Sequence, residues 1–252
     1  FGTWSVRLPE FNMTDLETLT MRSEVSHEQR LWQRCKAGFL VGTGRVGSMT
    51  AIELLRRHDG IDAHHEPFRR LLELTSPAYY DLAQRPDHYL EVFASHRAKA
   101  IEQSAERGTI YVESLNTSIM RLTPQLVTWM PNAAFILLHR HPGDFVRSGM
   151  RRCYYTGRHL WYRHRLAPRE DDPVFDLWDT WEPFDKICWN WRATNEFLLD
   201  SLDSIARERW TAVRFDHLID PSTDAAARMC RVLGVCPLSQ NVINDVLAQK
   251  HN

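Results

Sequence analysis

Short apolar runs alternate with helical patterns along most of this chain, and this alternation narrows the folds open to it. The apolar runs are short enough for buried strands, and they are Phe39–Val41, Thr109–Val112, Ala133–Leu138 and Thr211–Phe215. The helical patterns are Thr50–His58, His88–Arg107, Ser118–Met130 and Pro142–Arg152. Strands that alternate with helices pair in parallel, so we predict a three-layer α/β fold with a central parallel sheet flanked by helices.

The rest of the chain adds helices and shows no domain boundary. Apolar residues recur every three or four positions from Ile187 to Ile205, which predicts a long amphipathic helix. Ser222 is expected to cap another helix, which Gly234 ends. Because there is no internal repeat and no Gly/Ser-rich linker, we expect a single domain over residues 1–252.

A glycine-rich turn follows the first predicted strand and leads directly into a helix. It contains Gly42, Thr43, Gly44, Arg45, Val46, Gly47, Ser48, Met49 and Thr50. Backbone N–H groups and the helix dipole converge at such a turn, which favours an anion. The hydroxyls of Ser48 and Thr50 add donors and Arg45 adds a fixed charge, so the turn is a candidate phosphate-binding loop.

Two nucleotide-binding templates fit this turn incompletely. Gly42 and Gly47 match the glycines of the Gly-x-x-x-x-Gly-Lys-[Ser/Thr] loop, but Ser48 stands at the lysine position and Met49 at the hydroxyl position. Gly42, Gly44 and Gly47 also fit the dinucleotide fingerprint literally, although the charged Arg45 lies inside the turn. A nucleotide-binding P-loop module, kinase-like or non-catalytic, therefore remains the alternative interpretation.

A second candidate anion site follows the strand Ala133–Leu138. The strand is expected to end at Arg140, Pro142 begins a helix, and Ser148 lies two turns into it. An arginine provides a bidentate fork for phosphate, and a serine on the adjacent helix provides a hydroxyl. Arg152, one turn beyond Ser148, is a plausible extra contact, whereas an ordinary salt-bridged strand end is the alternative.

Together the two segments resemble the sulfotransferase family, in order and spacing, from about Phe39 to Gly234. In that family a glycine-rich loop with a basic residue binds the 5′-phosphosulfate of 3′-phosphoadenosine 5′-phosphosulfate (PAPS). A strand-end arginine, with a serine eight residues later, binds its 3′-phosphate. The resemblance implies a P-loop-like fold, Arg45 as the basic residue of the loop, and Arg140 with Ser148 at the 3′-phosphate. It further implies 3′,5′-adenosine bisphosphate as product and no metal.

Sulfuryl transfer also needs a base for the acceptor proton, and the segment after a short Ile61–Ala63 strand offers two. Glu66 resembles the glutamate that carbohydrate and protein-tyrosine sulfotransferases carry in a similar place. His65 is the rival, because a histidine side chain changes its charge near neutral pH. We expect the acceptor to be a carbohydrate or another small molecule with a hydroxyl group.

Charge and aromatic residues single out an insertion at residues 153–185. Eight arginines lie from Arg140 to Arg169 with one acid, seven acids lie from Glu170 to Asp185, and five of the nine tryptophans lie from Trp161 to Trp191. One interpretation is a solvated, loop-rich insertion that packs its aromatic residues on the core. The other is a lid that binds the acceptor.

Composition excludes several other functions. The net charge is −1, from 31 Lys and Arg against 32 Asp and Glu, so we expect no nucleic acid as partner. The longest apolar run, Ala133–Leu138, is too short to span a membrane. Five cysteines without a Cys-x-x-Cys pair favour a reducing, cytoplasmic location over a disulfide framework. The chain begins at Phe1 without a leader, so we expect a trimmed or mature start.

Overall fold

A parallel five-stranded sheet forms the centre of the protein. The computed structural model describes residues 32–67, 71–115, 117, 119–157 and 165–249. The sheet has the order β2-β3-β1-β4-β5, and every neighbouring pair of strands is parallel. The strands are β1 (Ala37–Val41), β2 (Ile61–His65), β3 (Ile110–Ser114), β4 (Ala134–His139) and β5 (Trp210–Arg214). The predicted α/β class and parallel sheet are confirmed.

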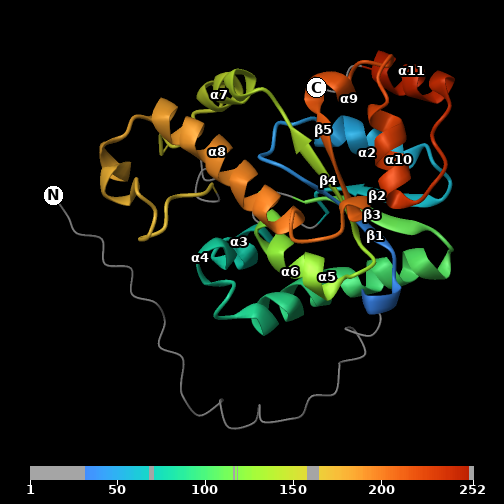
Figure 1. Ribbon diagram of the computed structural model, residues 1–252, viewed down its shortest axis with the longest axis horizontal. Helices are drawn as coiled ribbons and strands as arrows, with labels where there is room; N and C mark the ends of the chain where they lie inside the picture. Colours follow the sequence, from blue (N-terminus) through green and yellow to red (C-terminus); the bar gives the residue numbers. More distant parts are fainter. Residues whose placement is uncertain (1–31, 68–70, 116, 118, 158–164, 250–252) are drawn as a thin grey trace, which may run out of the picture.

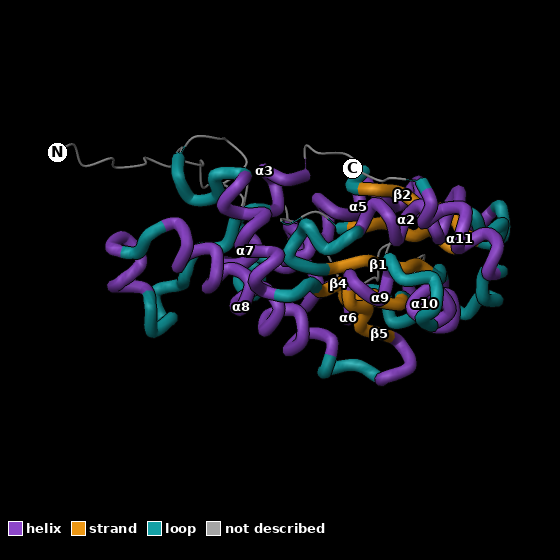
Figure 2. The backbone as a smooth tube through the Cα atoms, turned by 90° about the horizontal axis from the view of Figure 1, so that it is seen from above, coloured by secondary structure: helices purple, strands orange, loops and turns teal. Residues whose placement is uncertain are grey.

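Helices cover both faces of this sheet (Figures 1 and 2). One face carries α2 (Ser48–Arg56), α10 (Ala225–Leu233) and α11 (Gln240–Ala248). The other carries α5 (Pro86–Glu106), α6 (Thr123–Trp129) and α8 (Pro183–Leu202). The remaining helical elements are α3 (Leu71–Thr75), α4 (Ala78–Asp81), η2 (Ile119–Leu122), α7 (Pro142–Arg151), η4 (Phe175–Thr180), η5 (Arg207–Arg209) and α9 (Phe215–Leu218).

The alternation of side chains along the strands divides the core into two layers. In β1, Phe39 packs into the cluster that contains Phe93 of α5, whereas Leu40 packs into the cluster that contains Ile52 of α2. Successive strand residues point to opposite faces, so a sheet buried on both faces needs apolar residues at every position. All five residues of β1 are buried, which is why this segment appears in the sequence as an unbroken apolar run.

The order of the strands places the candidate site. From β1 the chain passes to β2 at one edge, returns through β3, and then crosses β1 to reach β4 on its other side. Because all five strands are parallel, the loops that follow them meet at one edge of the sheet. Open α/β sheets bind ligands at this edge, where the direction of the strand order reverses. Here that point lies between the loops after β1 and β4.

Two predictions about helices are wrong. The segment predicted as one helix over Ser118–Met130 is a 3₁₀ turn, η2, followed by α6 from Thr123, and Ser118 itself lies outside the described residues. Pro124 is in the first turn of α6, because a proline without an N–H fits there and not inside a helix. Ser222 does not cap α10, since its hydroxyl donates to Asp220 and α10 begins only at Ala225.

The predicted end of α10 is confirmed, and the predicted long helix is present but begins earlier than expected. Gly234 ends α10 with φ of 74°, the left-handed conformation that glycine adopts most easily. The long amphipathic helix predicted from Ile187 is α8, which begins four residues earlier at Pro183. Phe215, expected at the end of a strand, is instead the first residue of α9.

Candidate active site

The glycine-rich turn between β1 and α2 is compact because two of its glycines face close neighbours. A Cβ atom on Gly42 would lie 2.4 Å from the carbonyl oxygen of Leu138 in β4. Gly47, with φ of 86°, precedes α2, and a Cβ there would lie 2.7 Å from the ring of Phe215. Gly44 and Arg45 are also left-handed, with φ of 76° and 59°. These positions explain why the turn needs glycine.

The structure brings the two predicted anion sites together. Because β1 and β4 are adjacent strands, the segment after β4 lies against the turn after β1. Arg140 Nη1 donates a hydrogen bond to the carbonyl oxygen of Arg45 at 3.2 Å. The Arg140 guanidinium also lies over the ring of Phe215, 4.3 Å from its centroid. Trp191 Nε1 donates to the Arg140 carbonyl oxygen at 3.1 Å, which fixes the backbone at this point.

Arginines gather around the turn with little compensating negative charge. Although Arg45 reaches solvent, partial burial lowers its pKa below the ordinary value, and the charges of Arg152, Arg140 and Arg165 lower it further. Arg140 Nε has no hydrogen-bond partner among the described residues, and its closest carboxylate is Asp144 at 3.9 Å. Such a set of guanidinium groups fits a ligand with several negative charges.

The other residues predicted for the 3′-phosphate lie on α7. Ser148 is half-buried in this helix, and its carbonyl oxygen accepts a hydrogen bond from the Arg152 N–H at 3.2 Å. Arg152 follows the last residue of α7 and is exposed. The structure therefore places Ser148 in the helix that begins two residues after Arg140, and Arg152 one turn further at the end of that helix.

The remaining residues predicted for the turn differ in exposure. Thr43, Val46 and Thr50 are buried, whereas Ser48 is half-buried and Met49 is exposed. Thr43 Oγ1 donates to the carbonyl oxygen of Gly44 at 3.2 Å. Of these side chains, Ser48 is therefore the hydroxyl best placed to meet a ligand.

Both candidate bases lie at the end of β2, close to the start of α2. His65 Nε2 is 3.4 Å from Ser48 Oγ, so the end of β2 contacts the glycine-rich turn across the sheet edge. The Glu66 N–H donates to Ser114 at the end of β3, at 3.2 Å to its hydroxyl and 3.3 Å to its carbonyl. Glu66 has φ of 42°, an uncommon value for a residue other than glycine.

A buried ion pair beneath this segment was not predicted. Arg97 of α5 and Glu113 of β3 are both completely buried and form an ion pair, and the Tyr111 hydroxyl donates to the same carboxylate. Burial raises the pKa of Glu113, while Arg97 and Tyr111 oppose this rise. Arg97 Nη2 also donates to the Pro67 carbonyl oxygen at 2.8 Å, so the pair supports the backbone immediately after Glu66.

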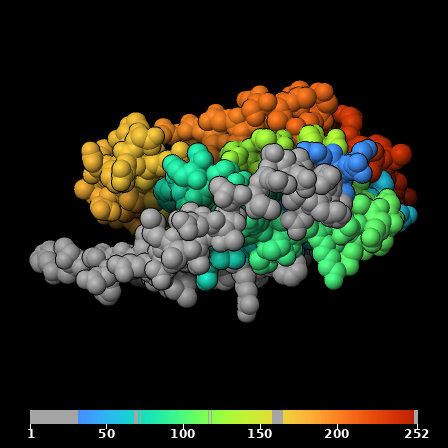
Figure 3. Space-filling model, turned by 90° about the horizontal axis from the view of Figure 1, so that it is seen from below, coloured from blue at the N-terminus to red at the C-terminus, as the bar shows by residue number. Residues whose placement is uncertain are grey.

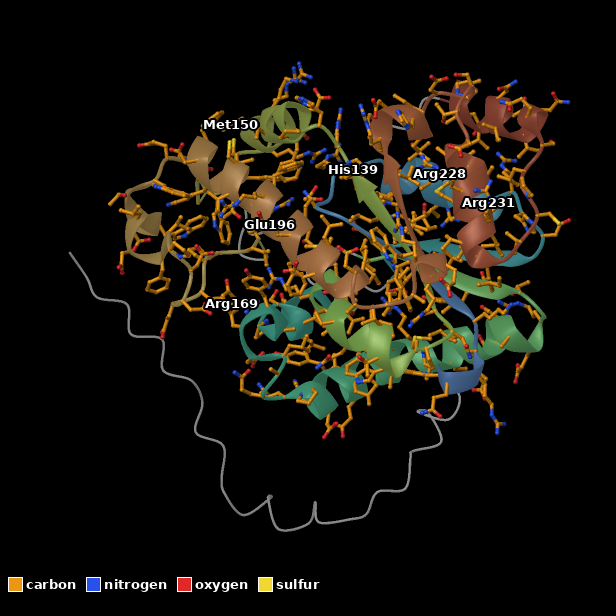
Figure 4. All side chains as sticks on the ribbon, viewed as in Figure 1. His139, Met150, Arg169, Glu196, Arg228 and Arg231 are labelled. Carbon is orange, nitrogen blue, oxygen red and sulfur yellow. The ribbon has the colours of Figure 1, made fainter. Side chains whose placement is uncertain are left out.

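The insertion at 153–185 packs much of its aromatic surface on itself and on two helices. Leu166, Trp178 and Trp181 pack with Trp189 of α8 and Tyr79 of α4. Figure 3 shows the insertion in yellow at one end of the molecule, next to the teal segment that contains α3 and α4. Arg169 extends this contact, because its guanidinium lies 4.2 Å from the centroid of the Tyr79 ring (Figure 4). Trp161 lies outside the described residues.

The histidines that flank Arg140 have separate surroundings. His139 is half-buried at the end of β4, and His141 is exposed and accepts a hydrogen bond from the Gly143 N–H, capping α7. Within the described part of the chain, no group of three or more His, Cys, Asp or Glu side chains could hold a metal ion. The five cysteines are all free thiols in the structure.

Residues 39–236 match the family model described as the sulfotransferase family, so the chain belongs to this family. No curated protein sequence matches it significantly. Among solved structures, it resembles the sulfotransferase domain of the olefin synthase from Synechococcus PCC 7002, with 18% identity and a TM-score of 0.52 over 82% of this chain and 75% of that one. It also resembles a sulfotransferase domain from the curacin biosynthetic pathway, with 14% identity and a TM-score of 0.54 over 83% and 77% of the two chains. Both likenesses confirm the fold.

Family and fold together make the protein a sulfotransferase enzyme. Among the helices described, none is both long and apolar enough to cross a membrane.

Proposed function

We propose that this enzyme transfers a sulfuryl group from PAPS to a hydroxyl group of a carbohydrate or another small molecule. The observation that carries the proposal is the contact between Arg140 and the backbone of Arg45, which joins two sources of positive charge at the glycine-rich turn. PAPS is anionic at both ends of its adenosine, and this cluster of arginines suits such a ligand. When bound, PAPS supplies the sulfuryl group and provides 3′,5′-adenosine bisphosphate as the leaving group.

We assign the donor site to the two segments on β1 and β4. Gly42, Thr43, Gly44, Val46, Gly47, Met49 and Thr50 shape the turn, and Arg45 and Ser48 provide its charge and hydroxyl for the 5′ end. Arg140, Ser148 and Arg152 bind the 3′-phosphate. Arg45 also stabilises negative charge where the sulfuryl group is transferred, so it counts among the catalytic residues with Glu66 and His65.

For the proton of the acceptor hydroxyl we favour Glu66 as the base. Its backbone is held by Ser114, and the next residue is held by Arg97, so the carboxylate extends from a fixed segment beside the turn. His65 remains the rival because its ring lies 3.4 Å from Ser48 Oγ. A base must be placed within reach of the proton it removes, and both side chains lie at the correct edge of the sheet.

We propose that the whole chain forms one domain and that residues 153–185 form the acceptor side of the site. Tyr79 of α4 and Trp178 of the insertion are partly exposed aromatic residues on this side, and both pack against the buried Trp189 cluster. Aromatic faces of this kind bind sugars and other rings. The acceptor therefore approaches from α4 and the insertion, opposite the helices α10 and α11.

The proposal is tested by ligand-dependent stability followed by turnover. In thermal unfolding, 3′,5′-adenosine bisphosphate is expected to raise the Tm, whereas NAD and ATP with magnesium are not. Arg140→Ala should weaken binding of the bisphosphate by about 10- to 100-fold, because it removes charge-assisted hydrogen bonds. Transfer of labelled sulfate from PAPS to a panel of hydroxyl acceptors then tests catalysis. Stabilisation by ATP with magnesium alone, or binding without transfer to any acceptor, would contradict the proposal.

A further inference from the structure

Arg165 lies in the insertion, yet its side chain reaches the glycine-rich turn. Arg165 Nη1 donates a hydrogen bond to the carbonyl oxygen of Thr43 at 3.1 Å, across 122 positions of sequence. The charge of Arg165 also acts on Arg45, which lies two residues further along the same turn. The insertion therefore contributes to the edge of the sheet where the donor is expected to bind.

A turn after α7 provides a flat surface on which the Arg165 guanidinium rests. The Arg165 guanidinium lies over the ring of Tyr154, 3.8 Å from its centroid. Tyr154 is buried and packs against Gly149 of α7, where a Cβ would lie 2.9 Å from the ring. The glycine in α7 thus leaves room for the tyrosine that supports the arginine.

The backbone of this turn is strained on both sides of Tyr154. Cys153 has φ of 53° and Tyr155 has φ of 60°, which are left-handed values in residues that carry a Cβ. Such residues are energetically unfavourable and persist only where surrounding contacts hold them. With this backbone the Tyr154 ring lies beneath the Arg165 guanidinium, and the Tyr155 hydroxyl reaches Leu166.

Tyr155 holds the residue that follows Arg165. Its hydroxyl donates to the Leu166 carbonyl oxygen at 2.6 Å, and Leu166 is itself buried. Burial raises the pKa of Tyr155, so the hydroxyl keeps the proton that it donates. Three contacts therefore hold Arg165 in place: the Tyr154 ring, the hydrogen bond to Thr43, and the hydrogen bond from Tyr155 to the next residue, Leu166.

No carboxylate forms an ion pair with Arg165 within the described residues. The charged groups that it influences are the arginines Arg45 and Arg121. A guanidinium carries five N–H donors, and the contact with Thr43 uses only one nitrogen. An arginine held rigidly beside other arginines, with donors to spare, is arranged for an anion.

We propose that Arg165 is a further donor-binding residue, which contacts the 5′ phosphosulfate group, and that the Cys153–Tyr155 turn positions it. This inference rests on the proposed use of PAPS. The 5′ end is assigned because Arg165 contacts Thr43 in the glycine-rich turn. Arg140 also contacts this turn, at Arg45, and its assignment to the 3′-phosphate rests on the family resemblance and on Ser148 in the helix that follows it. The insertion would then contribute to both binding sites, because Arg165 would add a contact with the donor beside the proposed acceptor surface.

Equilibrium binding by isothermal titration calorimetry tests this with three ligands: 3′,5′-adenosine bisphosphate, 5′-AMP and 3′-AMP. Arg165→Gln keeps a donor for Thr43 but removes the charge. It should weaken binding of the bisphosphate and 5′-AMP about tenfold or more, and binding of 3′-AMP less than twofold. Arg140→Gln should weaken binding of the bisphosphate and of 3′-AMP by a similar factor and binding of 5′-AMP less than twofold. Tyr155→Phe, which releases Leu166, should weaken the same ligands as Arg165→Gln but less strongly.

Arg169→Gln is the matched control, because Arg169 belongs to the same insertion and also rests on a tyrosine ring without contacting the turn. It should bind all three ligands as the wild type does. Wild-type protein that fails to bind the bisphosphate would overturn the proposed function and this inference with it. Wild-type binding with an Arg165→Gln variant that matches it, or that loses all three ligands equally, would overturn the inference alone. Should Arg165→Gln fail to fold, Arg165→Lys, which keeps the charge and loses the fork, is expected to show the same ligand pattern at smaller size.

Discussion

Two effects restrict Gly47 to glycine: its left-handed backbone and the close approach of the Phe215 ring. A comparison with another left-handed glycine separates them. Gly47→Ala places a methyl group 2.7 Å from the Phe215 ring at φ of 86°. Gly108→Ala has a similar φ of 71° but meets no atom within 4 Å. We expect Gly108→Ala to cost about 1 kcal/mol and Gly47→Ala roughly 2–4 kcal/mol, because only the second adds overpacking. Urea unfolding measures both, and equal losses would show that Phe215 moves away freely.

The assignment of the base predicts a contrast between two neighbouring residues. Glu66→Gln should retain bisphosphate binding within about twofold and lower kcat by about 10²–10⁴-fold, the usual contribution of a general base. His65→Ala should have a smaller effect on kcat, although loss of its contact with Ser48 can raise the KM for PAPS. Steady-state kinetics with both variants give the answer. A full rate in Glu66→Gln together with a lost rate in His65→Ala would transfer the role to His65.

The lowered pKa of His139 predicts how the free energy of unfolding changes with pH. His139 lies at the end of β4 (Figure 4), where burial and the charge of Arg214 lower its pKa below the ordinary value. As the pH falls, His139 of the unfolded chain takes up a proton near pH 6.5, whereas His139 of the folded protein stays neutral. The free energy of unfolding therefore has its full value above that pH and decreases as the pH falls below it. His139→Gln should remove part of the loss of stability between pH 7 and pH 5. Urea unfolding at several pH values tests this, and identical profiles for the two proteins would refute it.

At the scale of elements, the ion pair between α5 and β3 supports the segment that carries Glu66. Glu113→Gln leaves Arg97 charged and completely buried without its partner, so we expect a loss of about 3–5 kcal/mol. The double variant Arg97→Met/Glu113→Leu should recover much of this stability, because it removes both charges. It should not recover kcat, since the contact between Arg97 and the Pro67 carbonyl oxygen is lost. Urea unfolding and kinetics are measured on the same samples.

The sequence predicts an element well when neighbouring residues alone determine its structure. Strands β1 and β4 are apolar runs buried on both faces, and their short length and unbroken apolar character identify them. The turn is equally evident, because the local backbone conformation requires Gly44 and Gly47, whereas Gly42 is required by the approach of Leu138 in β4. The break before α6 was missed because the pattern is helical on both sides of Pro124.

Contacts between residues that are far apart in the sequence could not be predicted in the same way. Arg140 and Arg45 are 95 positions apart, and their contact depends on β1 and β4 being neighbours. Arg97 and Glu113 are each unremarkable in the sequence, and only the packing of α5 on β3 joins them. In the sequence, Arg165 is one of eight arginines in a basic stretch and nothing distinguishes it from the others. The left-handed residues Cys153 and Tyr155 are not glycines, so the sequence does not mark the strained turn either.

At the scale of the whole molecule, the positive charge is local. The chain has a net charge of −1, yet Arg45 is influenced by three further arginines. We expect bisphosphate binding to weaken several-fold between 50 and 500 mM NaCl, because salt screens this partly exposed cluster. Duplex DNA at micromolar concentration should not compete, since the net charge of −1 gives the protein no general attraction to a nucleic acid backbone. Competition by DNA, measured by fluorescence polarisation, would contradict this expectation.

The hydrogen bond from Arg165 to Thr43 bears on how the enzyme could be redesigned. The glycine-rich turn and Arg140 are attached to central strands, whereas the insertion lies at one end of the molecule, which invites exchanging that insertion to obtain new acceptors. A chimaera that replaced the whole of residues 153–185 would, however, discard Tyr154, Tyr155 and Arg165 along with the acceptor surface. Grafts that begin after Leu166 keep Tyr154, Tyr155 and Arg165, so if these residues bind the donor and the insertion binds the acceptor as proposed, a library confined to that part should change acceptor selectivity and leave donor binding intact.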